Sequence, residues 1–140
     1  MHIVWEDAFA RLSMEKRKKV SFLHLTALKS KPTWEEWRTL QDAVRKFYAQ
    51  ADASNMNLCL IFDLRNLGML PLPMFHEWKE LFDEVRPITK KIVHCSAMVL
   101  SSFIKDALVL FLKSYKSERK IYIEDDLERA IHACLSHKSE

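Results

Sequence analysis

The amino-acid sequence predicts an α/β protein with a single mixed, mostly parallel β-sheet of about five strands, flanked by about four helices. Two observations support this prediction. The run from Asn57 to Asp63 is apolar almost throughout and does not alternate, which is typical of a strand buried on both faces. Similar runs alternate with helical patterns in the order ββαβαβαβα, which favours parallel strands joined by crossover helices.

The beginning of the chain has the pattern of strands. The residues from Ile3 to Ser13 alternate in part and predict a short strand or two. The stretch from Glu15 to Lys19 contains no apolar residue and predicts a solvated turn. The residues from Val20 to Leu25 predict the next strand, and because the connection is short we expect an antiparallel pair.

Two helical patterns lie on either side of the central apolar strand. Thr33 and Glu36 match a capping box, in which a hydroxyl and a carboxylate satisfy free amides at a helix start. That helix should reach about Gln50. The second helix should carry Pro73 in its first turn and end near Arg86–Pro87.

The last third of the chain repeats the alternation of strand and helix. The residues from Ile92 to Val99 predict another buried strand, and Ser101 begins a third helix that should end near Tyr115. The residues from Arg119 to Ile123 predict the last strand. The acidic stretch from Glu124 to Asp126 then favours the start of a final helix, because carboxylates stabilise a helix N-terminus.

Length and composition indicate a small globular protein. The 140 residues fit one domain, which we predict to span residues 1–140. No apolar run approaches the roughly 18 residues of a membrane-spanning helix, and the first residues lack the order of a secretory signal. We therefore expect a cytoplasmic protein with no integral membrane segment. The net charge of +3, with acidic residues interleaved, predicts no nucleic-acid partner.

The central strand and the elements after it resemble a known family. The string from Leu60 to Leu64, the helix that follows it, and the short strand with an acidic helix start near the C-terminus resemble the STAS-like superfamily. That superfamily includes anti-sigma-factor antagonists and the cytoplasmic domains of sulphate transporters. The resemblance covers roughly Val20 to Leu135 and implies the fold and the docking of partners. The antagonists carry a phosphorylated serine after the central strand, whereas Leu64 to Phe75 contains no Ser or Thr, so we do not expect that switch.

A second resemblance concerns part of the chain. The region from Asp63 to Leu112 is similar to part of the CRAL-TRIO lipid-binding fold, with a comparable strand around Ile92 to Ala97. That resemblance implies a carrier for a lipid or a small apolar ligand. CRAL-TRIO proteins are longer and carry an N-terminal helical segment and a gating helix, for which this sequence has no counterpart.

Polar side chains on the predicted strands are candidates for chemistry. Asp63 ends a strand, where receiver domains carry a phosphoacceptor, but the further acids and the lysine of such a site have no convincing counterparts. We favour a structural role for Asp63, such as pairing with Arg65. His24, Cys59 and His94 are ligand types that can hold zinc, yet their spacing matches no metal motif. We therefore predict no metal and no cofactor.

The cysteines and the single glycine do not favour an enzyme. Cys59, Cys95 and Cys134 lie in apolar surroundings and are expected to be reduced and buried. Cys95 beside His94 resembles a nucleophile with its base, but neighbouring strand residues point to opposite faces, which disfavours that pair. One glycine, Gly68, cannot build a phosphate-binding loop. We predict no catalytic residues.

The loop after the central strand is unusually apolar. Loops run over the surface and are normally polar, so an apolar loop either folds onto a helix or meets a partner. We hypothesise a non-catalytic interaction or regulatory module that docks a protein partner, or a second copy of itself, through this loop. A carrier of a lipid or small apolar ligand is the alternative. The candidate partner-binding residues are Arg65, Leu67, Met69, Leu70, Leu72 and Met74.

Overall fold

The computed structural model describes residues 1–102, 104–107, 109 and 120–137. Six strands form one sheet in the order β1-β2-β3-β4-β5-β6. Their bounds are His2–Glu6, Ala10–Arg17, Val20–Ala27, Leu58–Asp63, Val93–Val99 and Ile121–Glu124. β1, β2 and β3 pair antiparallel, whereas β3, β4, β5 and β6 pair parallel. The predicted α/β fold with one mixed sheet is confirmed, with six strands where about five were expected.

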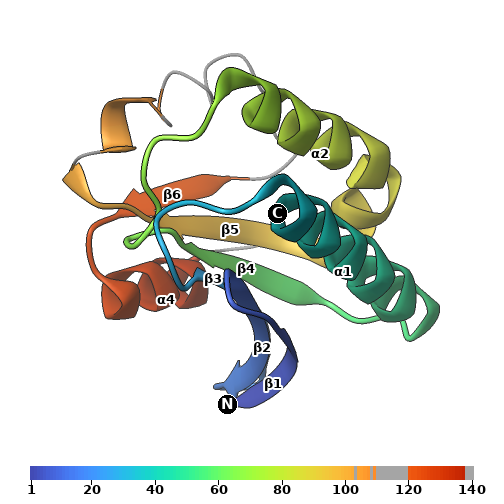
Figure 1. Ribbon diagram of the computed structural model, residues 1–140. Coiled ribbons are helices and arrows are strands. Elements are labelled where there is room, and N and C mark those ends of the chain that lie inside the picture. Colours follow the sequence, from blue (N-terminus) through green and yellow to red (C-terminus); the bar gives the residue numbers. More distant parts are fainter. Residues whose placement is uncertain (103, 108, 110–119, 138–140) are drawn as a thin grey trace.

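Helices cover both faces of this sheet (Figure 1). α1, Trp34–Ala53, and α2, Leu72–Ile92, pack against each other over one face, and α4, Leu127–Ser136, covers part of the other. Residues 102, 104–107 and 109 are helical, and the rest of the helix predicted from Ser101 to Tyr115 lies mostly outside the described residues. Within the described ranges, no helix has both the length and the apolar character needed to cross a membrane.

The N-terminal hairpin differs from its prediction in where the chain turns. β2 continues to Arg17, and the turn consists of Lys18 and Lys19, with φ values of 50° and 69°. Two successive residues with positive φ match the right-handed twist of the paired strands in a tight hairpin. The prediction of a solvated turn from Glu15 onward is therefore wrong in its extent, and Glu15 lies on a strand.

The start of α1 is the capping box predicted from the sequence. The amide of Glu36 donates to Oγ1 of Thr33 at 3.1 Å, and the amide of Thr33 donates to Oε1 of Glu36 at 2.9 Å. These two bonds satisfy amides that have no partner within the helix. The helix ends at Ala53, a little beyond the predicted Gln50.

The second helix does not end at Pro87 as predicted, because α2 continues through this residue to Ile92. A proline inside a helix costs about 3 kcal/mol through its lost hydrogen bond and its steric clash. Beyond the proline, Ile92 is buried and Ile88 packs against the core. Fully burying an isoleucine side chain contributes about 1.5–3 kcal/mol, so buried Ile92 and partly buried Ile88 together offset the cost.

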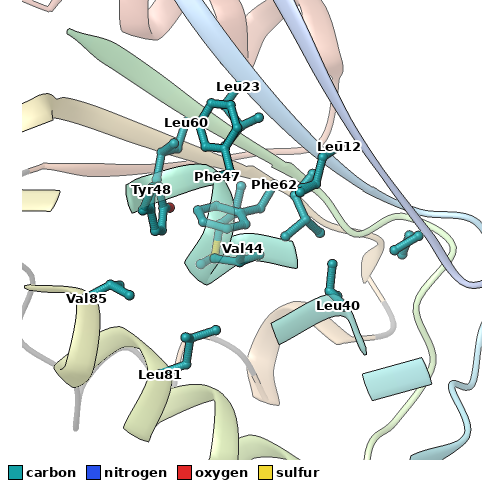
Figure 2. Packing of buried hydrophobic residues seen from close by; sticks show 14 of the residues in the cluster. Leu12, Leu23, Leu40, Val44, Phe47, Tyr48, Leu60, Phe62, Leu81 and Val85 are labelled. Carbon is teal, nitrogen blue, oxygen red and sulfur yellow. The ribbon is translucent and has the colours of Figure 1, made fainter. Parts of the chain in front are cut away.

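Two apolar cores lie on opposite faces of the sheet because strand residues alternate between the faces. All residues of β4 are buried, as its unbroken apolar pattern predicts. The larger core lies between the sheet, α1 and α2, and Figure 2 shows side chains from all three meeting there, among them Leu23, Leu60, Val44, Phe47 and Leu81. The smaller core, beneath α4, contains the three cysteines.

Candidate functional site

The loop between β4 and α2, residues 64–71, is tied to the rest of the molecule. Leu67 and Leu70 are buried, each with 7% of its surface exposed. The amide of Gly68 donates to the carbonyl of Ser30 at 2.8 Å, which joins the loop to the segment after β3. A Cβ at position 68 would lie 3.3 Å from this carbonyl oxygen, so glycine permits the close approach of the two segments.

Three of the six predicted partner-binding residues belong to the core. Leu67, Leu70 and Met74 pack into the larger apolar core. The loop folds down onto the sheet because burying these side chains removes apolar surface from water. Leu67, Leu70 and Met74 are buried and present little surface to a partner.

The other three residues are exposed and lie in the loop or, for Leu72, at the start of α2. Met69 and Leu72 have 53% and 68% of their surface exposed, and Arg65 is also exposed. They lie where the chain leaves β4 at its carboxyl end. We call Arg65, Met69 and Leu72 the edge surface.

Asp63 and Arg65 form an ion pair at the start of this loop. Arg65 donates from Nε and Nη2 to the two carboxylate oxygens of Asp63, at 2.9 and 2.7 Å. The hydrogen bonds to Asp63 raise the pKa of the Arg65 guanidinium. Nδ2 of Asn66 donates to the carbonyl of Ala27 at 3.1 Å and fixes the same turn to β3. The predicted pairing of Asp63 with Arg65 is confirmed.

An apolar cavity of about 50 Å³ lies between the sheet, α1, α2 and this loop. Leu67 and Leu70 form part of its wall, together with Trp37 of α1 and Trp78 of α2. A cavity of about 150 Å³ accommodates benzene, and pockets for drug-sized ligands measure about 300–1,000 Å³. This cavity is therefore too small for a lipid.

Three cysteines meet on the sheet face that α4 covers, and we call them the thiol cluster. The sulfur atoms of Cys59, Cys95 and Cys134 all lie within 4.8 Å of one another, and all three residues are buried, as predicted. Sγ of Cys59 is 3.4 Å from Sγ of Cys95 and 3.4 Å from Nε2 of His94. Cys134 was not grouped with the others from the sequence, because only the packing of α4 brings it to β4 and β5.

A β-bulge explains why both His94 and Cys95 reach Cys59. Leu58 pairs with Val93 and the next residue, Cys59, pairs with Cys95, so His94 is an extra residue in β5. An extra residue breaks the alternation of side chains between the two faces. The expectation that His94 and Cys95 point to opposite faces is wrong for this reason.

The three thiols of the cluster differ in pKa. Hydrogen bonding with Cys134 and with Cys59 lowers the pKa of Cys95 to about 3, against the effect of burial. Hydrogen bonding with Cys134 lowers the pKa of Cys59, but its bond with Cys95 and its burial prevail and raise that pKa to about 12. Bonds with Cys59 and Cys95 raise the pKa of Cys134. Hydrogen bonding with its two neighbours therefore favours the ionised form of Cys95 over that of the other two thiols.

One solved structure shows which fold this arrangement of strands and helices represents. It is an uncharacterized protein of the DUF3478 family from Shewanella loihica PV-4, described as having a SpoIIAA-like fold. The match has a TM-score of 0.68 at 13% sequence identity and covers 92% of this chain and 96% of that chain. This chain has a SpoIIAA-like fold. The predicted STAS-like architecture is thus confirmed.

The likeness to that SpoIIAA-like protein concerns the fold. No protein-family model and no curated protein matches the chain. The roles of the edge surface and the thiol cluster are therefore inferred from the geometry of this chain alone.

Within the SpoIIAA-like sheet, His24 has a partner of its own. Its Nε2 lies 3.1 Å from Oε1 of Glu15 on the neighbouring strand β2, and only 2% of the residue surface is exposed. Burial lowers the pKa of His24, although the hydrogen bond and the charge of Glu15 oppose the change. His24 is thus satisfied by a hydrogen bond within the sheet.

Proposed function

We propose that this SpoIIAA-like chain is a non-catalytic interaction module that docks a protein partner through the edge surface. The exposure of Met69 and Leu72 carries this proposal, because the neighbouring leucines Leu67 and Leu70 are buried. Met69 and Leu72 are large apolar side chains that do not belong to the core. Binding of a partner that removes them from water lowers the free energy of the complex. Arg65, exposed in the same loop as Met69, would supply a charged group of the kind that is common around the apolar centre of an interface.

The attachment of the loop supports the same proposal. The bond from Gly68 to Ser30 and the pair between Asp63 and Arg65 hold the loop before any partner arrives. A surface ordered in advance loses less conformational entropy on binding. The flexible side chain of Met69 adapts to the shape of the partner.

A carrier of a lipid or a small apolar ligand is supported less well. The cavity of about 50 Å³ holds no such ligand, and enlarging it would require lining side chains such as Leu67 and Leu70 to leave the core. That movement would expose the side chains that anchor the loop.

Affinity capture from a cell extract tests the docking proposal. The double variant Met69→Asp plus Leu72→Asp places charge on the edge surface without touching the core. Ile3→Asp is the matched control, because Ile3 is 52% exposed and lies on β1 at the edge of the sheet. Strands β2 and β3 lie between β1 and β4. We expect the wild type and the control to recover the same partner and the double variant to lose it, with equal melting temperatures for all three. Recovery of the same amount of partner by all three folded proteins would contradict the proposal.

Light scattering of the purified protein determines whether the partner is a second copy of the chain. A dimer in the wild type and the control, with a monomer in the double variant, identifies self-association. A wild-type monomer directs the search to a different protein.

A further inference from the structure

We propose that the thiol cluster of Cys59, Cys95 and Cys134, completed by His94, is a binding site for one Zn²⁺ ion. Three cysteines and one histidine are a ligand set found in structural zinc sites. The ligands come from β4, β5 and α4, so an ion held by them would join the sheet to the helix that covers this face. The site lies apart from the edge surface and does not depend on the docking proposal.

The spacing of the three sulfur atoms fits the size of the ion. With Zn–S bonds of about 2.3 Å, sulfur ligands stand about 3.8 Å apart in a tetrahedral site and about 4.0 Å apart in a planar one. The observed Cys59–Cys95 separation is 3.4 Å, and no pair in the cluster is separated by more than 4.8 Å. Small side-chain rotations are therefore enough to bring all three sulfurs to bonding distance.

The position of His94 fits the fourth ligand. With a Zn–N bond of about 2.0–2.1 Å, a nitrogen and a sulfur ligand stand about 3.6 Å apart around the ion. Nε2 of His94 lies 3.4 Å from Sγ of Cys59. The β-bulge in β5 places this imidazole beside the sulfur of Cys59, and a rotation of the ring would bring Nε2 to an ion shared with the other two sulfurs. His94 is partly exposed, whereas the cysteines are buried, so the imidazole marks the side from which an ion enters.

Coordination requires no oxidant or reductant. Each protonated thiol releases its proton when its sulfur bonds to Zn²⁺, and neutral His94 contributes the lone pair of Nε2. Three Zn–S bonds and one Zn–N bond form, and the coordinated group carries one negative charge. Because protons are released, the affinity for zinc should rise with pH.

Titration of the full, reduced and metal-free chain with Zn²⁺ tests this proposal. Native mass spectrometry should show one zinc ion per chain. A ligand that binds the folded state stabilises it, and at a free concentration of 100 Kd the melting temperature should rise by roughly 10 °C. A wild-type chain that takes up no zinc at micromolar concentration, or whose melting temperature does not change, overturns the proposal.

Two variants assign the ligands. Cys134→Ala and His94→Ala each remove a direct ligand, so each should weaken zinc binding by more than the about 10- to 100-fold that loss of an outer-shell partner costs. His132→Ala is the control, because His132 is exposed on α4 and should bind zinc as the wild type does. Unchanged affinity in folded Cys134→Ala contradicts the site.

The wild-type chain also provides a test that does not depend on the folding of a variant. Co²⁺ is a coloured substitute for Zn²⁺, and thiolate ligands give it charge-transfer absorption in the near ultraviolet. We expect this absorption to reach saturation at one Co²⁺ per chain and to disappear on addition of Zn²⁺. Its absence overturns the proposal even if Cys134→Ala fails to fold.

Discussion

The amide of Gly68 lies 2.8 Å from the carbonyl oxygen of Ser30, and the hydrogen bond between them joins the segments that follow β4 and β3. These strands are parallel neighbours, so their carboxyl ends lie at the same edge of the sheet. The bond fixes the backbone beside Met69, one of the two exposed apolar residues of the edge surface. The contact between Gly68 and Ser30 therefore helps to order the backbone that carries Met69.

A larger side chain at position 68 should disturb this contact. Gly68→Val should lower the free energy of unfolding by about 1–3 kcal/mol, because its Cβ would meet the Ser30 carbonyl at 3.3 Å and its methyl groups would crowd the site further. Gly68→Ala, which adds the Cβ alone, should have a smaller effect. Urea denaturation measures both, and a wild-type midpoint for Gly68→Val would contradict the close approach.

Replacement by alanine should reduce stability strongly at Leu70 and hardly at all at Leu72. Leu70→Ala should cost about 2–5 kcal/mol of stability because it leaves a cavity in the core, whereas Leu72→Ala should change stability by less than about 0.5 kcal/mol. Urea denaturation of the two variants makes the comparison. Similar losses in both would show that the loop is not divided into anchoring and exposed residues.

The capping box of α1 should contribute measurably to stability. Thr33→Ala removes the oxygen that accepts the amide of Glu36 and should cost about 1 kcal/mol. Thr33→Ser keeps the hydroxyl and serves as the control. Thermal denaturation should place Thr33→Ala below both other proteins, and three equal melting temperatures would be inconsistent with the cap.

Stability should depend on pH through His24. Burial lowers the pKa of His24 in the folded protein below its ordinary value of 6.5, so the unfolded chain binds more protons in the range between the two values. The contribution of His24 is complete above about pH 6.5 and is lost as the pH falls toward the lowered folded pKa. Glu36 and Glu77 are half-buried and their pKa values are also lowered, so their contributions to stability are lost only as the pH falls below about 4.5.

The variant His24→Gln isolates this effect. The free energy of unfolding of the wild type should fall between about pH 7.5 and pH 5.5, and the variant should lose less over the same interval. Urea denaturation at the two pH values gives the comparison. An equal loss in both proteins would assign the pH dependence to other groups.

Most of the fold is predictable from the sequence because its signals are local. The unbroken apolar pattern of β4 and the capping box at Thr33 each specify an element without reference to the rest of the chain. The turn at Lys18–Lys19 and the continuation of α2 through Pro87 are not predictable in this way. Lysine seldom adopts positive φ, and α2 passes Pro87 because residues beyond it are buried in the tertiary structure.

The candidate sites were predictable only in part. The sequence identifies the apolar loop, but the core decides that Leu70 points inward and Leu72 outward. The thiol cluster could not be predicted, because a bulge at His94 breaks the alternation of the strand and α4 supplies Cys134 from a distant part of the chain.

Isothermal titration calorimetry with the purified partner tests the central claim most directly. The partner would be titrated into the wild type, the Met69→Asp plus Leu72→Asp variant and the Ile3→Asp control. Loss of two apolar contacts should raise the dissociation constant of the double variant about 100-fold and leave that of the control unchanged. The same dissociation constant for all three proteins would contradict docking through the edge surface.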